Sequence, residues 1–231
     1  MFLKSLVFPE HSNGLFYIAA LIPVHMAEQK MFSSKFDMLV NLTEGKYDAF
    51  LYDCDGTLAD NMQAHKDSYV KVAAGYGIDL DPAIIDELAG FPTIEVVAEI
   101  NKRYNTNFDT REFAEAKSGV FYDEYMQHTK PVDFVVAHLL EHAGKTKIGV
   151  VSGGRRKTVQ KTLETLGLFD KIDVLVCAGE TPNGKPFPDP FLAAAEKLGV
   201  APSNCMVFED GDPGVRAAET AGMKWVRIDW I

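Results

Sequence analysis

Short apolar runs alternate with longer stretches whose apolar residues recur at helical spacing through most of this chain. The short runs are apolar almost throughout, as strands buried on both faces are. We expect strands at five such runs: Asp48–Asp53, Lys147–Ser152, Ile172–Cys177, Cys205–Glu209 and Trp225–Asp229. Several helical stretches between them end at a glycine, a residue that commonly terminates helices. The alternation predicts an α/β fold in which a parallel sheet carries helices on both faces.

One connection is much longer than a crossover requires. About 90 residues separate the first expected strand from the second, whereas a simple crossover needs only about a dozen. This interval has no convincing strand pattern, but helical patterns occur at Ala64–Tyr76, Pro82–Ala89, Thr93–Tyr104 and Thr110–His128. We therefore expect residues 63–130 to form an inserted helical cap domain, and residues 46–62 and 131–231 to form the α/β core domain.

The first 45 residues differ in character from the rest and are expected to form an N-terminal extension, 1–45. Phe36, Leu39 and Val40 have helical spacing, which predicts a helix that packs on the core. The apolar run Leu15–Val24 is as long as the core of a signal peptide, but no cleavage site follows it. The run is also too short to span a bilayer. We expect no membrane anchor and a cytoplasmic protein.

Composition narrows the class of partner. Hydrophobic residues make up 47% of the 231 residues, which is enough for a substantial core. The chain has 33 acidic and 23 basic residues and a net charge of −10. Nucleic acid is excluded as a general partner, because non-specific binding to its phosphates needs a basic surface. The three cysteines lack a metal-ligand spacing, so we expect reduced core residues. A monomer and a homodimer are both compatible with the sequence.

Polar residues gather where the expected strands end. Ligands of parallel α/β sheets bind at the carboxyl ends of the strands. The polar residues at or beyond these ends are Asp53, Asp55, Ser152, Gly153, Lys185, Glu209 and Asp210. Carboxylates from two strands, with no cysteine or histidine among them, suit a hard divalent cation, and Mg²⁺ is the usual choice when a phosphate shares the site. Such a cation also relieves the repulsion between the carboxylates.

The same strand ends carry groups that can bind a phosphate. Ser152 offers a hydroxyl, Gly153 lets a backbone N–H approach an anion, and Lys185 brings a positive charge. Thr57 is expected to orient the loop after the first strand, and the phosphate, by hydrogen bonding. With metal and phosphate bound, one aspartate can attack phosphorus as a nucleophile and the other can act as acid and then as base. The pattern predicts a site for phosphate chemistry on a small phosphorylated metabolite.

Four segments together carry a resemblance to a known family. They are DCDGT at residues 53–57, Ser152 after an apolar run, Lys185 within GKPFPDP, and FEDGDPGVRAA at residues 208–218. In this order they resemble the motifs of the haloacid dehalogenase-like phosphohydrolase superfamily. The resemblance implies a Rossmann-like sheet with an inserted helical cap. Within the superfamily, the chain looks nearest to the β-phosphoglucomutase-like group and its sugar-phosphate phosphatases.

The resemblance also implies roles for individual residues. Asp53 would be the nucleophile and Asp55 the general acid and base, while Ser152 and Lys185 would stabilise the phosphate. The implied ligands of Mg²⁺ are the Asp53 side chain, the Asp55 backbone carbonyl, Asp210 and, directly or through water, Glu209. Dehalogenases of the superfamily lack an acid two residues after the nucleophile, so Asp55 favours phosphoryl transfer.

Residues of the expected cap bear on the substrate. His65 stands where the resembled group has a histidine at the hinge into the cap, and Lys117 resembles a cap lysine that meets the sugar phosphate. The segment LAGFPT at residues 88–93 resembles the cap loop that lines the substrate. At the position of Thr93, the β-phosphoglucomutases of the resembled group have an arginine that binds a second phosphate. A mutase must hold a bisphosphate by both ends, so the absence of this arginine favours hydrolysis of a monophosphate.

These features predict a Mg²⁺-dependent phosphatase that hydrolyses a small phosphorylated metabolite, in the first place a sugar phosphate, through an aspartyl-phosphate intermediate. Two alternatives stay open. One is a β-phosphoglucomutase-like phosphomutase, and the other is a non-catalytic protein that binds phosphate for regulation. Regulatory proteins of this kind usually lack the nucleophile or the acid, and both are present here.

Overall fold

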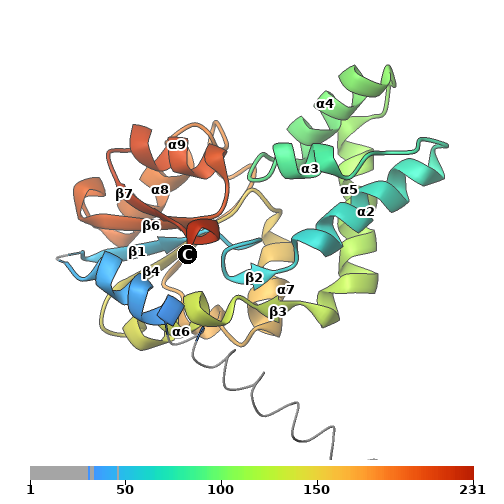
Figure 1. Ribbon diagram of the computed structural model, residues 1–231. Helices are drawn as coiled ribbons and strands as arrows, with labels where there is room; N and C mark the ends of the chain where they lie inside the picture. Colours follow the sequence, from blue (N-terminus) through green and yellow to red (C-terminus); the bar gives the residue numbers. More distant parts are fainter. Residues whose placement is uncertain (1–30, 32–33, 46) are drawn as a thin grey trace, which may run out of the picture.

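Five parallel strands form the central sheet, in the order β5-β4-β1-β6-β7 (Figure 1). This computed structural model describes residues 31, 34–45 and 47–231. The strands are β1 Ala49–Tyr52, β4 Lys147–Val151, β5 Val174–Val176, β6 Cys205–Glu209 and β7 Lys224–Arg227. All five expected runs form strands, and the expected α/β class with a parallel sheet is confirmed. The last strand ends earlier than expected, because Ile228–Trp230 turns into a short 3₁₀ helix.

Alternation along β1 divides the core into two layers. Phe50 and Tyr52 pack into one cluster and Ala49 and Leu51 into the other, because successive side chains of a strand point to opposite faces. The helices that contribute to the first layer are α6 (Asp133–His142) and α7 (Arg156–Thr165), and those of the second are α8 (Asp189–Leu198) and α9 (Asp212–Thr220). Figure 1 shows α8 and α9 above the sheet and α6 below it.

Residues 34–43 form a helix that packs on the same layer as α6. Leu39 of this helix is fully buried in the core, and Phe36 packs against it. The apolar run Leu15–Val24 lies outside the described residues. Within the part of the chain that the structure describes, no helix combines the length and the apolar character that a membrane span requires. All three cysteines of the chain are buried and free of disulfide bonds.

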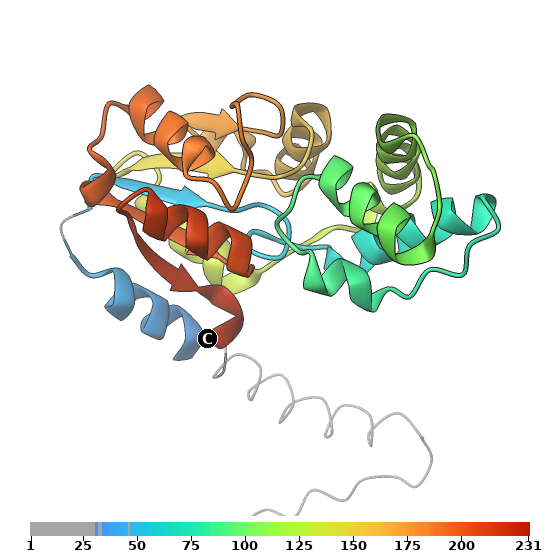
Figure 2. The same ribbon diagram turned by 90° about the horizontal axis from the view of Figure 1, so that it is seen from above.

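The inserted segment is helical and has a core of its own. Its helices are α2 Met62–Gly75, α3 Ala83–Glu87, α4 Thr93–Tyr104 and α5 Thr110–Val120. Tyr69, Ile100 and Phe113 belong to a buried cluster that is separate from both layers of the sheet. Figures 1 and 2 show these helices to one side of the sheet. We call this helical unit the cap, and its limits at residues 63 and 130 stay a prediction.

The last cap helix departs from the sequence expectation. A single α-helix was expected to reach His128, but α5 ends at Val120 and is followed by a π turn, Phe121–Tyr125, and a 3₁₀ turn, Met126–His128. The side chain of Phe121 is buried at this change of winding, and its ring stacks on His65 with 4.1 Å between the ring centroids. The π turn therefore lies where Phe121 contacts α2, and the periodicity of the sequence gives no sign of this contact.

Two chain crossings join the cap to the core. The short strands β2 Ala59–Asp60 and β3 Lys130–Pro131 pair in antiparallel fashion where the chain leaves the core and returns. The sequence pattern predicts no strand here, which is wrong for β3. Two residues are too few for a periodic signal, and these strands exist because the two crossings lie side by side. The pairing places α2, with its polar residues, directly after the loop that follows β1.

Candidate active site

Carboxylates from two strand ends converge on one buried lysine. The Asp53, Glu209 and Asp210 side chains each have an oxygen within 4.8 Å of the others. Lys185 comes from the loop between β5 and α8, and the residue is 2% exposed. Its Nζ donates to Asp53 Oδ1 at 2.6 Å, to Glu209 Oε1 at 2.5 Å and to the Val151 carbonyl at 2.8 Å. All three protons of the ammonium are used, so Lys185 is fixed in position beside Asp53.

This cluster holds more negative charge than one lysine can balance. Burial is the main reason that the pKa of Asp53 lies well above its usual value; Lys185 opposes the rise, while Glu209 and Asp210 add to it. Burial and then Glu209 raise the pKa of Asp210 to about 7. Carboxylates with raised pKa values in a site that offers only oxygen donors fit a hard divalent cation such as Mg²⁺.

Glu209 occupies a less open position than the two aspartates. Its Oε1 accepts from Lys185, and its Oε2 accepts from the backbone N–H groups of Asp210 and Gly211 at 3.1 and 3.2 Å. A Cβ atom added to Gly214 would lie 1.8 Å from Oε1. The carboxylate is therefore packed behind the cluster, where it orients the loop that carries Asp210.

Thr57 and Gly56 shape the turn after β1. The Thr57 hydroxyl is fully buried and donates to Asp210 Oδ1 at 3.1 Å. Gly56 has a φ of +89°, and a Cβ atom there would lie 2.1 Å from Asp210 Oδ2. Thr57 was expected to hydrogen-bond the loop and the phosphate; the structure places its hydroxyl on Asp210, so the turn after β1 is tied to the turn after β6.

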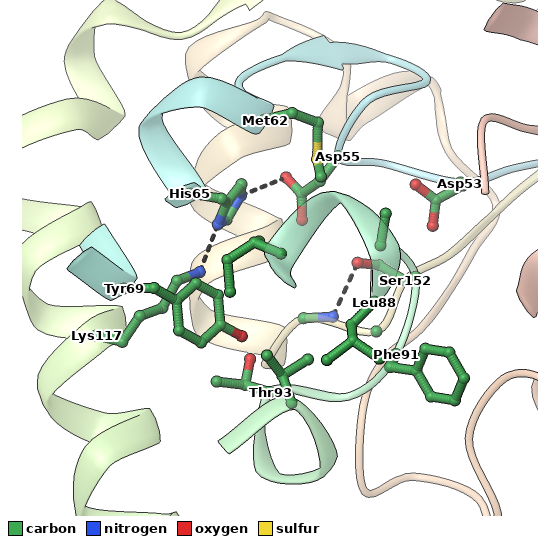
Figure 3. A pocket seen from close by; sticks show the side chains of 16 residues that line it. Asp53, Asp55, Met62, His65, Tyr69, Leu88, Phe91, Thr93, Lys117 and Ser152 are labelled. Carbon is green, nitrogen blue, oxygen red and sulfur yellow. Dashed lines mark hydrogen bonds and ion pairs between the residues drawn. The ribbon is translucent and has the colours of Figure 1, made fainter. Parts of the chain in front are cut away.

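Asp55 faces the cap and has different partners from Asp53 (Figure 3). Its Oδ1 accepts from Asn61 Nδ2 at 2.6 Å and lies 3.2 Å from His65 Nε2. Lys117 Nζ on α5 lies 2.5 Å from His65 Nδ1. Burial raises the pKa of Asp55, but His65, Asn61 and Lys117 outweigh it and lower the pKa to about 2. The two aspartates therefore have opposite electrostatic surroundings.

The pKa values of the histidine and the lysine in this chain of contacts are both lowered. Burial, followed by the charge of Lys117, lowers the pKa of His65. Burial lowers the pKa of Lys117 to about 8. A neutral His65 that accepts a hydrogen bond from Lys117 at Nδ1 carries its proton on Nε2, toward Asp55. The predicted residues His65 and Lys117 are thus brought together with Asp55, across the boundary between core and cap.

Ser152 and Gly153 line a cavity together with Asp53 and Asp55, and Figure 3 shows Ser152 beside them. Ser152 Oγ accepts from the Gly154 N–H at 3.0 Å, which leaves its own proton free to donate. Among the described residues, no acceptor is hydrogen-bonded to the N–H of Gly153. The Ser152 hydroxyl and the Gly153 N–H are therefore both available to donate to an anion. Lys185, in contrast, lies behind Asp53 rather than in the wall of this cavity.

The cavity between core and cap has a volume of about 80 Å³. Asp53, Asp55 and residues 152–154 form its core side, and the cap closes it. Leu88 and Phe91 in the lining belong to the segment 88–93 that is expected to line the substrate. The sequence does not single out the other cap residues of the lining, which are Tyr69, Met62, Ile85 and Val96. The spacing of Tyr69 four residues after His65 could have placed it on the same face of α2, but the others needed the tertiary structure. Thr93 lines the cavity as well, with its hydroxyl toward Tyr69.

Comparison with known proteins decides the family. A family model described as haloacid dehalogenase-like hydrolase matches residues 50–228. The chain belongs to this family. The expectation drawn from the four motifs is thereby confirmed, and so is the expected class of enzyme. The individual residue roles that the motifs imply stay predictions.

Relatives of this haloacid dehalogenase-like chain include phosphatases and phosphomutases. It is 30% identical over 183 residues to the fructose-1-phosphate phosphatase YqaB of Escherichia coli K12, covering 79% of this chain and 97% of that protein. It is 27% identical to the β-phosphoglucomutase of Bacillus subtilis 168, with 76% and 80% covered. The structure of β-phosphoglucomutase from Clostridium difficile aligns with a TM-score of 0.71 at 29% identity, over 78% of this chain and 84% of that one.

Proposed function

We propose that the protein is a Mg²⁺-dependent phosphatase that hydrolyses the monophosphate of a small carbohydrate. The observation that carries the proposal is the placement of Asp53 and Asp55 on one side of a small cavity, with separate partners. The free donors Ser152 and Gly153 beside them support a bound phosphate. A relative named as a fructose-1-phosphate phosphatase supports a carbohydrate substrate.

The residues that would hold Mg²⁺ are the Asp53 and Asp210 side chains and the Asp55 backbone carbonyl. Glu209 would support the cation indirectly, because both of its oxygens already accept hydrogen bonds. When bound, Mg²⁺ supplies positive charge to the carboxylates and to the oxygens of the phosphate, which favours attack by an anion on phosphorus.

Asp53 is the proposed nucleophile. Its carboxylate forms a bond to phosphorus while the bond between phosphorus and the sugar oxygen breaks, and the leaving oxygen takes a proton from Asp55. Water then attacks the phosphorus of the aspartyl phosphate and gives a proton to Asp55, which releases inorganic phosphate and restores Asp53. Lys185 keeps Asp53 in line through its 2.6 Å hydrogen bond and adds positive charge next to the reacting group.

Asp55 must gain a proton when the substrate binds. With a pKa of about 2, this carboxyl is ionised near neutral pH. A phosphate bound beside it adds like charge, which raises the pKa of a carboxyl. The cavity is enclosed by the cap, so the phosphate would act through a medium that screens charge less than bulk water does. Substrate binding and protonation of Asp55 are thus coupled.

The experiment is a phosphate-release assay on fructose 1-phosphate, hexose 6-phosphates and p-nitrophenyl phosphate with Mg²⁺. We expect turnover by the wild-type protein and a loss on the order of 10³-fold or more for Asp53→Asn and Asp55→Asn on the sugar phosphates. The exposed Asp170→Asn serves as the matched control and should retain activity. Turnover by Asp53→Asn at the wild-type rate would exclude the proposal.

A phosphomutase is the second candidate, because relatives named β-phosphoglucomutase align over most of the chain. It predicts conversion of a hexose 1-phosphate to the 6-phosphate when a bisphosphate primes the reaction. The cavity argues against it, because no arginine among the described residues lines the wall where Thr93 lies. Release of free phosphate without isomerisation would exclude this candidate.

A further inference from the structure

Three core loops approach the same short cap segment at glycines. The segment is residues 88–93, which joins α3 to α4 and lines the cavity. The glycines are Gly153 after β4, Gly184 in the loop between β5 and α8, and Gly211 after β6, and we call them the glycine seat. The loops come from separate strands, so their common target is a property of the tertiary structure.

The contacts at the glycine seat leave little space for a side chain. A Cβ atom added to Gly153 would lie 3.2 Å from the Gly90 carbonyl oxygen, and one added to Gly211 would lie 3.2 Å from the Ala89 carbonyl oxygen. At Gly184, an added Cβ atom would lie 2.7 Å from Cγ of Pro92. Ala89, Gly90 and Pro92 of the cap segment thus each lie against a different core loop.

Backbone conformation does not explain these glycines. Other glycines of the chain, such as Gly56 and Gly90, have positive φ values that favour glycine, but Gly153, Gly184 and Gly211 do not. A residue with a side chain could adopt their backbone conformations. The property of glycine that matters at these positions is therefore the missing side chain.

The contact is also free of polar bonds. Within the described part of the chain, no hydrogen bond joins residues 88–92 to the core. Elsewhere between cap and core in the described residues, His65 lies 3.2 Å from Asp55, and Glu115 pairs with Arg155 at 3.3 Å. Both side chains of the second pair are exposed, so it contributes little. Close van der Waals contact without hydrogen bonds can be made and released as the cap moves.

We propose that the glycine seat positions the cap segment over the catalytic aspartates and so sets the size of the substrate cavity. This inference deepens the proposed function and rests on it. Because Leu88, Phe91 and Thr93 line the cavity, lifting their backbone moves the wall that faces the leaving group. The cavity then fits a small sugar phosphate less well and admits water beside it, so turnover of that substrate falls. A flat aryl phosphate makes less use of this wall, so its turnover falls less.

The decisive variant is Gly184→Ala, whose new methyl group meets a side chain that can itself be removed. We expect kcat/KM for the most active sugar phosphate of the panel to fall by about 10-fold or more, since small misplacements of a substrate are costly, while kcat/KM for p-nitrophenyl phosphate changes less than about 3-fold. In the Pro92→Ala background, Gly184→Ala should have almost no effect, because Cγ and Cδ of Pro92 are gone. Gly119→Ala, which meets open space on α5, is the control.

Two outcomes would overturn the inference. An equal loss on both substrates would show displacement of the neighbouring Lys185, and a loss that Pro92→Ala does not rescue would show that the contact with the cap is irrelevant. Hydrogen exchange of peptides covering residues 88–93 separates this test from the proposed function. Gly184→Ala should speed exchange there and the double variant should restore it, even if the wild-type protein releases no phosphate; unchanged exchange would exclude the glycine seat.

Discussion

A single ammonium group governs the charge balance of the site. Lys185 donates to Asp53, to Glu209 and to a backbone carbonyl, and all of these atoms are removed from solvent. The surrounding carboxylates raise the pKa of Lys185 in spite of its burial. Removal of one partner from a buried ion pair costs far more than removal of an exposed pair, because the remaining charge is left uncompensated.

Lys185→Met should therefore lower the free energy of unfolding by about 3–5 kcal/mol. The measurement is urea denaturation in the presence of EDTA, so that no cation replaces the missing ammonium. The control is Lys171→Met, which removes an exposed lysine next to Asp170 and should leave the midpoint unchanged. A loss below about 1 kcal/mol would show that the carboxylates are compensated in another way.

At the scale of elements, a polar contact ties the helix of residues 34–43 to the sheet. Tyr52 of β1 lies 2.8 Å from His138 Nδ1, and Thr43 Oγ1 lies 2.8 Å from His138 Nε2. Thr43 Oγ1 also donates to the Leu39 carbonyl. A neutral His138 with its proton on Nε2 satisfies every group: it accepts from Tyr52 and donates to Thr43. Burial, with a smaller effect of His142, lowers the pKa of His138 from its usual 6.5 to about 3.

This histidine should make the fold sensitive to acid. Below pH 6.5 the unfolded chain binds a proton that the folded protein excludes, so stability is present above that pH and is lost as the pH falls toward 3. From pH 7.5 to pH 5, the wild-type free energy of unfolding should fall by about 2 kcal/mol more than that of His138→Gln. Denaturation at both pH values measures the difference.

His128→Gln is the matched control for this titration, because His128 is exposed. It should show the same pH dependence as the wild-type protein. His138→Gln should be less stable than the wild type at pH 7.5, because its side chain cannot make both hydrogen bonds in the same geometry. Equal pH dependence of the wild type and His138→Gln would contradict a neutral buried His138.

At the scale of the whole molecule, a bound cation would join loops that are distant in sequence. Asp53 follows β1, and Asp210 follows β6, and the two strands pair in the centre of the sheet. A ligand that binds the folded state alone stabilises it in proportion to the logarithm of its concentration. The proposed Mg²⁺ site therefore has a readout that does not depend on activity.

Mg²⁺ at 100 times its dissociation constant should raise the melting temperature by about 5–10 °C, which corresponds to about 2.7 kcal/mol for a chain of this size. Asp210→Asn should lose most of this rise. Asp212→Asn, at the start of α9, removes a carboxylate that pairs with Arg227 outside the cluster, and it should keep the rise. A melting temperature that Mg²⁺ does not change would argue against the site.

Much of this arrangement could be predicted from the sequence, because its signals are local. The run Cys205–Glu209 is apolar up to its last residue, and the structure makes it a strand with the predicted bounds. Thr93–Tyr104 forms the predicted helix. Asp53, Glu209 and Asp210 meet because parallel strands end at one edge of a sheet. The wide turn at Phe121 and the ribbon of β2 and β3 escaped prediction, since both depend on contacts with distant segments.

What the sequence by itself determined is the five strands of the central sheet, most of the helices, the family and the chemistry that the strand ends can perform, because these depend on residue type and near-neighbour spacing. The tertiary structure alone decided which groups contact one another: Thr57 donates to Asp210, Asn61 donates to Asp55, and the cap segment packs on the glycine seat. Each of these joins elements whose distance is set by packing of the whole core. A glycine in a loop looks the same in the sequence whether it meets solvent or a neighbouring backbone, and only the folded chain distinguishes the two.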